Sequence, residues 1–135
     1  MNPVTEYPAA PATQAESWFA AKCQFETDCA DVHTALAEAE PGFVLLHVVG
    51  LPAQFARRHI PGARHLPHRQ ITSETLSRWP ADTLFVVYCA GPHCNGADRA
   101  ALKIARLGRP VKVMPGGLTG WADEGFAFSS DSVTE

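Results

Sequence analysis

The chain has 135 residues, of which 46% are hydrophobic and 19% charged, with a formal net charge of -3. This length and composition are typical of one globular domain, and no apolar run reaches the roughly 20 residues of a membrane-spanning helix. Because the charge provides no basic field, we expect neither nucleic acid nor a membrane as a partner.

The first residues are predicted to form a flexible arm. Residues 1–12 hold three prolines and three alanines, with little periodic apolar pattern. We therefore divide the chain into an N-terminal arm, residues 1–13, and a single domain, residues 14–130. Trp18 and Phe19 predict a short helix at the start of that domain.

Short apolar runs alternate with segments of helical periodicity along the rest of the chain. Thr27 or Asp28 is a candidate N-cap for a helix that carries Val32 on its buried face. Small apolar residues predict a helix over 97–105, which stops at Gly108. Strands are expected at residues 24–26, 43–49, 64–67, 84–88 and 111–114. Other helical segments are expected at 51–58, at 73–79 and around Trp121.

This alternation predicts a parallel α/β sheet with helices on both faces. In such sheets, functional residues gather at the carboxyl ends of the strands. Cys89 directly follows the apolar strand at 84–88, so we expect it at one of those ends.

Cys89 is the strongest candidate for a catalytic residue. The segment that joins it to the next helix, called the Cys89 loop below, consists of Ala90, Gly91, Pro92, His93, Cys94 and Asn95. We expect amides of this loop and of the helix N-terminus to face Cys89 and to stabilise a thiolate or persulfide. A lowered pKa of the Cys89 thiol follows. Asn95 and Asp98 predict a capping box at the start of that helix.

Cys94 is a possible resolving thiol. Gly91-Pro92 bends the chain between the two cysteines and can bring their Cα atoms within disulfide range. Cys94 would then attack sulfur held on Cys89 and discharge it. The alternative is that Cys94 only packs under the loop. His93 also has two interpretations, either an imidazolium that favours the Cys89 thiolate or a solvated side chain.

The other candidate residues receive weaker interpretations. Cys23 and Cys29 are predicted to be buried apolar side chains. Because no secretory segment is present, we expect reduced cysteines and a cytoplasmic location. We expect no metal site, because the histidines at 59, 65 and 68 lack cysteine or carboxylate ligands at fixed spacing.

Two further hypotheses depend on arginines. One is a phosphatase site, and the other is a surface that attracts an anionic donor. An arginine six positions after a catalytic cysteine would clamp phosphoryl oxygens, but Asn95 occupies that position and argues against a phosphatase. Arg57 and Arg58 either draw an anionic donor toward the site or form a solvated helix face.

Several segments together resemble the rhodanese-like domain family, over most of residues 28–125. The resemblance implies a three-layer sandwich around a five-stranded, mostly parallel sheet. The segments stand in family order and comprise Val44–Val49, Gln54-Phe55, Arg58–Ala63, Leu66-Pro67, Val86–Cys89, Gly116-Gly117 and Gly120-Trp121.

The same resemblance implies a thiosulfate-type sulfurtransferase with a persulfide on Cys89. Its partners would be a small anionic sulfur donor and a thiol, cyanide or protein sulfur acceptor, and no cofactor or metal would be required. The alternative is a non-catalytic rhodanese-like module that binds a partner or senses oxidants through Cys89 and Cys94.

Two family motifs are altered in this chain. His47-Val48-Val49 replaces the usual Asp-Val-Arg, and Gln54-Phe55 replaces the usual Glu-Phe. Because both sides of an ion pair are missing together, no charge is left uncompensated and we expect the fold to tolerate the change. The Cys89 loop is also longer than the short sulfurtransferase form and contains a second thiol.

Overall fold

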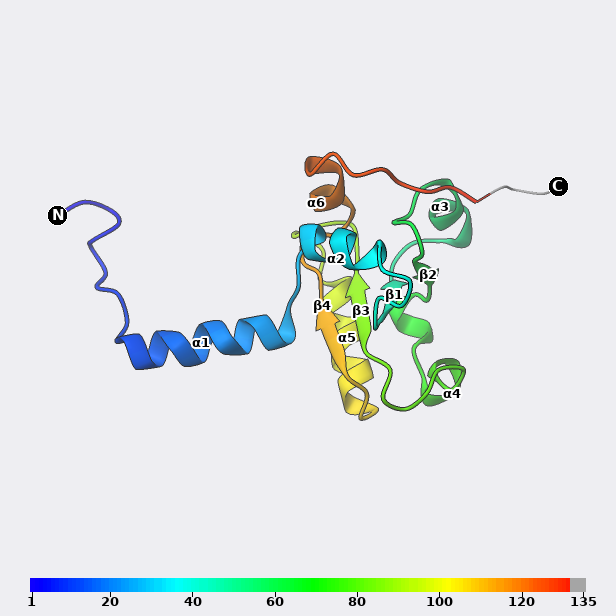
Figure 1. The fold of residues 1–135 in the computed structure, drawn as a ribbon, viewed down its shortest axis with the longest axis horizontal. Helices are drawn as coiled ribbons and strands as arrows, with labels where there is room; N and C mark the ends of the chain where they lie inside the picture. The colour runs from blue at the N-terminus through cyan, green and yellow to red at the C-terminus, as the bar shows by residue number, and fades with distance from the viewer. Residues whose placement is uncertain (132–135) are drawn as a thin grey trace.

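The centre of the fold is a parallel sheet of four strands in the order β2-β1-β3-β4, seen in a computed structural model that describes residues 1–131 (Figure 1). Every neighbouring pair runs parallel, as predicted. The central strands β1 and β3 are apolar and almost fully buried, because helices cover both of their faces. The strands are β1 (Val44–His47), β2 (Arg64–His65), β3 (Phe85–Tyr88) and β4 (Val111–Val113).

The predicted fifth strand, at residues 24–26, is wrong. Helix α1 (Ala12–Phe25) continues through this segment, and the amide of Glu26 still donates to the carbonyl of Lys22 at 2.9 Å. What remains of a strand is one parallel bridge between Glu26 and Val113, at the edge of β4. In the last turn of α1, backbone groups form helical hydrogen bonds instead of a ladder with the edge strand β4.

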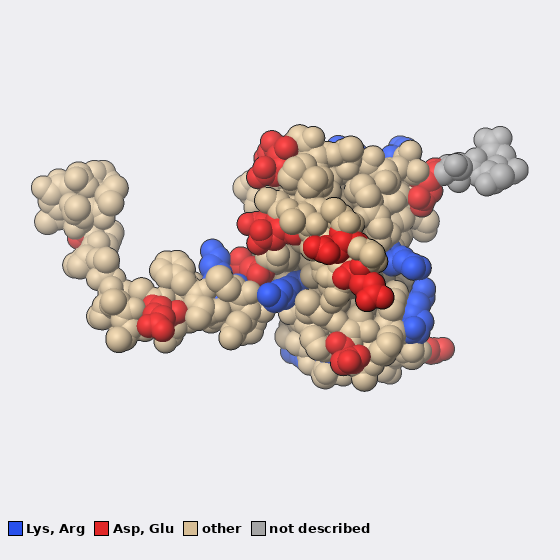
Figure 2. All heavy atoms as spheres, in the orientation of Figure 1, with Lys and Arg blue, Asp and Glu red and all other residues tan. Residues whose placement is uncertain are grey.

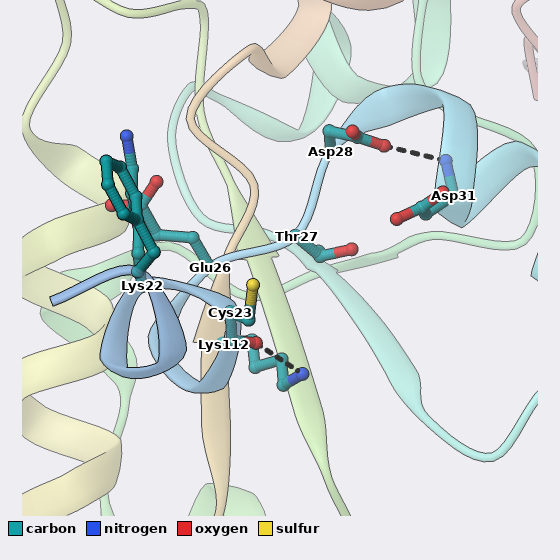
Figure 3. A pocket seen from close by; sticks show the side chains of 8 residues that line it. Lys22, Cys23, Glu26, Thr27, Asp28, Asp31 and Lys112 are labelled. Atoms are coloured by element: carbon teal, nitrogen blue, oxygen red, sulfur yellow. Dashed lines mark hydrogen bonds between the residues drawn. The ribbon is translucent and has the colours of Figure 1, made fainter. Parts of the chain in front are cut away.

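Helix α1 extends away from the rest of the molecule (Figure 1). None of its residues is buried, and Trp18, Phe19 and Phe25 are 61–68% exposed. A hollow separates its last turns from the sheet, where Lys112 Nζ donates to the carbonyl of Cys23 at 3.0 Å (Figure 3). This hollow contains no residue of the predicted site. The division of the chain at residue 13 stays a prediction.

Within residues 1–131, five α-helices pack against the sheet on two sides, which confirms the predicted three layers. Side chains of β3 point alternately to the two faces, so Val86 and Tyr88 contact one helical layer while Phe85 and Val87 contact the other. The first layer contains α2 (Cys29–Leu36), α3 (Pro52–Arg57) and α6 (Gly117–Asp123). The second contains α4 (Ser73–Leu76) and α5 (Gly96–Arg106), beside the short 3-10 helix η1 (His68–Gln70).

Local sequence signals set two helix boundaries as predicted. The Asp28 carboxylate caps α2 by accepting from the amide of Asp31 at 2.8 Å. Ala97, Ala100 and Ile104 form the buried stripe of α5. Gly108 follows that helix with φ +76°, a conformation that favours glycine.

Acidic and basic side chains are interspersed on the face shown in Figure 2, with an acidic group across its middle. Within residues 1–131, no helix combines the length and apolar character needed to cross a bilayer.

Candidate active site

Cys89 lies directly after the last residue of β3, as the sequence predicts. The strand pairs with β1 up to this point, where the amide of Val48 donates to the carbonyl of Tyr88 at 3.1 Å. The Cys89 side chain turns toward α5 and is 3% exposed. The sulfur donates to the carbonyl of Cys94 at 3.3 Å.

The predicted lowering of the Cys89 pKa is wrong. Burial raises the pKa of this thiol, and its hydrogen bond with the Cys94 side chain raises it further. The amide of Ala97 acts in the opposite direction but does not outweigh these effects.

Backbone amides also reach Cys94. The amide of Gly96, in the first turn of α5, donates to Cys94 Sγ at 3.4 Å. Partial burial raises the pKa of Cys94, but hydrogen bonds from the Cys89 side chain, Gly96 and Ala90 outweigh that effect, so the pKa is lowered. Cys94 is half-buried and packs against the core cluster beneath α5, as the packing interpretation expects, and it forms these hydrogen bonds as well.

A turn over Gly91–Cys94 brings the two cysteines together. The amide of Cys94 donates to the carbonyl of Gly91 at 3.1 Å, and Pro92 and His93 lie exposed at the tip of the turn. Asn95 precedes α5 as predicted, but its side chain makes no capping hydrogen bond, so the predicted capping box is wrong. With this turn and no side-chain cap, the amide of Gly96 is directed at Cys94 and that of Ala97 at Cys89.

The start of α6 holds the base of the Cys89 loop. The amide of Leu118 donates to the carbonyl of Cys89 at 3.1 Å. The amide and hydroxyl of Thr119 donate to the carbonyl of Ala90 at 2.9 and 3.1 Å. Gly117 has φ +56°, and a Cβ there would overlap the carbonyl oxygen of Cys89. The glycine therefore permits the close approach that these hydrogen bonds need.

His47, in the first altered motif, forms a hydrogen-bonded pair with Tyr88 of β3. Nδ1 of buried His47 lies 2.8 Å from the hydroxyl of Tyr88, which accepts from the amide of Ile60 at 3.2 Å. Burial, with smaller effects from His65 and His59, lowers the pKa of His47 to about 4. A neutral His47 that accepts from the Tyr88 hydroxyl satisfies all three groups.

In the second altered motif, the side-chain amide of Gln54 forms a hydrogen bond. Its Oε1 accepts from the amide of Leu51 at 2.8 Å, at the start of α3. Among residues 1–131, no buried side-chain nitrogen or oxygen lacks a hydrogen-bond partner. The substitutions at His47 and Gln54 therefore leave no buried polar group unsatisfied in that part of the chain.

A hollow of about 420 Å³ lies next to the Cys89 loop, at the carboxyl ends of β1 and β2. Val49 lines it and also packs against Gly96, so it joins the hollow to the loop. Arg69 and His68 line the hollow. Desolvation and the charges of Lys103, Arg69 and Arg99 lower the pKa of His68, which means that three cations surround it.

These cations were not predicted as site residues. Arg57 and Arg58, which were considered for that role, lie at the end of α3, where the Arg58 guanidinium stands 4.4 Å from the ring centre of Phe128. Thr119 and Val49 were also missed, because their contacts with the Cys89 loop join segments far apart in the sequence. No local pattern signals such contacts.

Of the other two cysteines, one is buried as predicted and one is exposed. Cys29 is buried as predicted, and its sulfur donates to the carbonyl of Gly117 at 3.7 Å. Burial, with smaller effects of Asp28 and Glu124, raises the pKa of Cys29. Cys23 is exposed, so its predicted burial is wrong.

Comparison with solved structures shows the same fold in other proteins. The BH2092 protein from Bacillus halodurans is 32% identical, with a TM-score of 0.84 over 89% of this chain and 87% of that chain. A full-length protein from Lactobacillus plantarum is 19% identical, with a TM-score of 0.74 over 89% of this chain and 99% of that chain. A thiosulfate sulfurtransferase from Pseudomonas aeruginosa is 24% identical, with a TM-score of 0.62 over 80% of this chain and 20% of that chain.

Sequence comparison identifies the family through a domain model and not through a curated relative. None of the curated proteins searched matches the chain. The model of the rhodanese-like domain matches residues 33–124, which include β1, the Cys89 loop and α6. The chain therefore belongs to the rhodanese-like domain family.

Proposed function

We propose that the protein is a sulfurtransferase that moves a sulfane sulfur from a small anionic donor such as thiosulfate to a nucleophilic acceptor. Sulfur is held in the cycle as a persulfide on Cys89. The observation that carries this proposal is the Cys89–Cys94 pair, two thiols in hydrogen-bond contact within an amide-lined loop at the carboxyl end of β3.

The surroundings of the pair suit a persulfide. A persulfide is anionic at neutral pH, and it needs hydrogen-bond donors that are fixed before sulfur arrives. The amides of Ala90, Gly96 and Ala97 point at the two sulfurs, and the contacts from α6 hold the loop in place. Because Cys89 is buried, water has little access to sulfur bound there.

The cations beside the loop favour an anionic donor. Arg69 lines the hollow together with His68, and the charges of Arg99 and Lys103 also act on His68. A group of like charges in a concave surface raises the local concentration of an oppositely charged ligand. Thiosulfate has the matching charge and carries the sulfane sulfur that the cycle needs.

Thiosulfate treatment followed by intact-mass measurement tests the proposal. The wild-type protein should gain one sulfur atom, proteolytic mapping of the trapped persulfide should place it on Cys89, and cyanide should remove it. Cys23→Ser is the matched control, because Cys23 is exposed and lies on α1 outside the site, so this variant should load sulfur as the wild type does. A wild-type protein that gains no sulfur would overturn the proposal.

The same pair of thiols supports a second candidate function, an oxidant-sensing module without sulfurtransferase activity. The hydrogen bond between the side chains of Cys89 and Cys94 favours a disulfide when an oxidant removes two electrons and two protons from the pair. Hydrogen peroxide is a suitable probe. Disulfide formation in a protein that never loads sulfur from thiosulfate would favour the sensor over the enzyme.

A further inference from the structure

We infer that two copies of this chain associate through α1, which pairs in antiparallel orientation with α1 of the second copy. Phe19 lies at the two-fold axis of this pair, and Glu16 of each copy lies level with Lys22 of the other. The inference concerns assembly and goes beyond the proposed sulfurtransferase function.

Helix α1 receives little support from its own chain. Its 14 residues span about 21 Å, and none of them is buried. The helix meets the rest of the molecule only near its last turn, through the hydrogen bond from Lys112 to Cys23 and the bridge between Glu26 and Val113 (Figure 1). An isolated helix of this length is marginally stable in water, and packing of an apolar face supplies most of the stability of a helix in a protein. A second surface is therefore needed to stabilise α1.

One face of α1 suits a second helix. With 3.6 residues per turn, Ala12, Ala15, Phe19 and Cys23 fall on one stripe, called the Phe19 face below. The two alanines permit close approach of another helix, while the Phe19 ring is 61% exposed and provides the large apolar side chain. Pairing of two such faces buries both Phe19 rings.

The space beside the Phe19 face is open. A hollow of about 460 Å³ separates it from the domain, and Phe19, Lys22 and Cys23 line the side of the hollow that α1 provides (Figure 3). The domain of the same chain therefore does not cover this face. Side chains of a second α1 can enter the hollow without any displacement of the sheet.

Charge makes the Phe19 face complementary to a second copy of itself. Glu16 and Lys22 are the charged residues of α1, and they stand three positions on either side of Phe19. Neither side chain forms an ion pair within residues 1–131. In an antiparallel pair with Phe19 at the axis, each Glu16 lies level with Lys22 of the other copy. A parallel pair in register would place like charges level with each other, so charge favours the antiparallel two-fold arrangement.

The size of the contact predicts a weak dimer. Two helices of about 21 Å belong at the low end of protein interfaces, below about 1,200 Å² of total buried surface. We therefore expect a dimer that dissociates in the micromolar range. The oligomeric state should depend on protein concentration.

Analytical ultracentrifugation of the full chain over a series of concentrations tests the inference. Wild type should pass from monomer to dimer as the concentration rises, and Phe19→Glu should raise the dimer dissociation constant by at least about tenfold. Phe25→Glu is the matched control, because Phe25 is 66% exposed on the same helix but is turned by about 120° from Phe19. It should associate as wild type does. A wild type that stays monomeric, or a Phe19→Glu variant that associates equally tightly, would overturn the inference.

Charge reversal tests the antiparallel orientation. Glu16→Lys and Lys22→Glu each place like charges level with one another, so each variant alone should associate several-fold more weakly than wild type. An equal mixture of the two variants should recover the association of wild type, because every mixed pair joins opposite charges at both contacts. A mixture as weak as the separate variants would rule out this orientation.

These measurements are independent of sulfur transfer. A monomeric wild type that gains sulfur from thiosulfate would overturn the inference and leave the proposed function in place. A dimeric wild type that gains no sulfur would overturn the proposed function alone.

Discussion

Nδ1 of His47 lies 2.8 Å from the hydroxyl of Tyr88, so a neutral hydrogen bond joins β1 to β3 at the position where the family has a charged residue. The hydroxyl also accepts from Ile60, in the segment that leads from α3 to β2. The two central strands and this connection are therefore tied together without a buried charge. Their carboxyl ends support the Cys89 loop.

Replacement of Tyr88 by Phe should destabilise the fold. It leaves the amide of Ile60 and Nδ1 of His47 without their partner, which costs about 1–3 kcal/mol in the free energy of unfolding. Urea denaturation measures the loss. Tyr7→Phe is the matched control, because Tyr7 is 78% exposed and should change the stability by less than about 0.5 kcal/mol. Equal stabilities of the two variants would contradict this role of Tyr88.

The stability of the protein should fall in acid because of His47. Its pKa is about 4 in the folded state and 6.5 as the ordinary value, so the unfolded chain binds more protons between these pH values. The stabilising effect of neutral His47 on the folded state is complete above pH 6.5 and is lost as the pH falls toward 4. The difference between the two pKa values of His47 corresponds to a loss on the order of 3 kcal/mol in the free energy of unfolding.

Denaturation of wild type and His47→Gln across this pH range checks that prediction. Glutamine can still accept a hydrogen bond from Tyr88, but it does not titrate. The stability difference between the two proteins should therefore shift in favour of the variant as the pH falls. Parallel pH profiles would mean that His47 does not titrate with a lowered pKa.

Gly117→Ala should disrupt the site more than its backbone strain alone explains. Alanine at φ +56° is strained, and its Cβ would overlap the carbonyl of Cys89, so the α6 contacts to the Cys89 loop should be displaced. Gly108→Ala is the control, because Gly108 has φ +76° and open space around the added Cβ. Both variants should lose about 1 kcal/mol of stability or more, but only Gly117→Ala should lose most of its sulfur loading. Normal loading by Gly117→Ala would contradict the role of α6.

Removal of cations beside the hollow should weaken donor binding. Arg69→Gln and Arg99→Gln should each raise the KM for thiosulfate several-fold, with a smaller change in kcat, because these charges act before the sulfur bond breaks. Added salt should reduce the difference from wild type by screening. Arg106→Gln, at the opposite end of α5, should leave the KM unchanged. If all three variants share the wild-type KM, the donor does not bind near these cations.

Features set by local sequence were predictable, and features set by contacts across the fold were not. The apolar run before Cys89, the Asp28 cap and the small stripe of α5 each depend on neighbouring residues, and the structure confirms them. The strand expected at residues 24–26 was wrong, because α1 extends through it and leaves only the bridge from Glu26 to Val113.

The chemistry of the site depended on side-chain directions that the sequence does not specify. Amides reach Cys89 as expected, but its thiol is buried, and the turn over Gly91–Cys94 places Cys94 within reach of amides as well. Position relative to β3 identified the loop. It did not show that Cys94, five positions after Cys89, shares the hydrogen-bond donors of the site.

Thiocyanate production from thiosulfate and cyanide tests the central claim most directly. The wild-type protein should form thiocyanate catalytically, Cys23→Ser should retain this activity, and Cys89→Ala should lose it because no Cys89 persulfide can form. Wild-type production no faster than in buffer, or undiminished turnover by a correctly folded Cys89→Ala variant, would contradict a sulfurtransferase that works through Cys89.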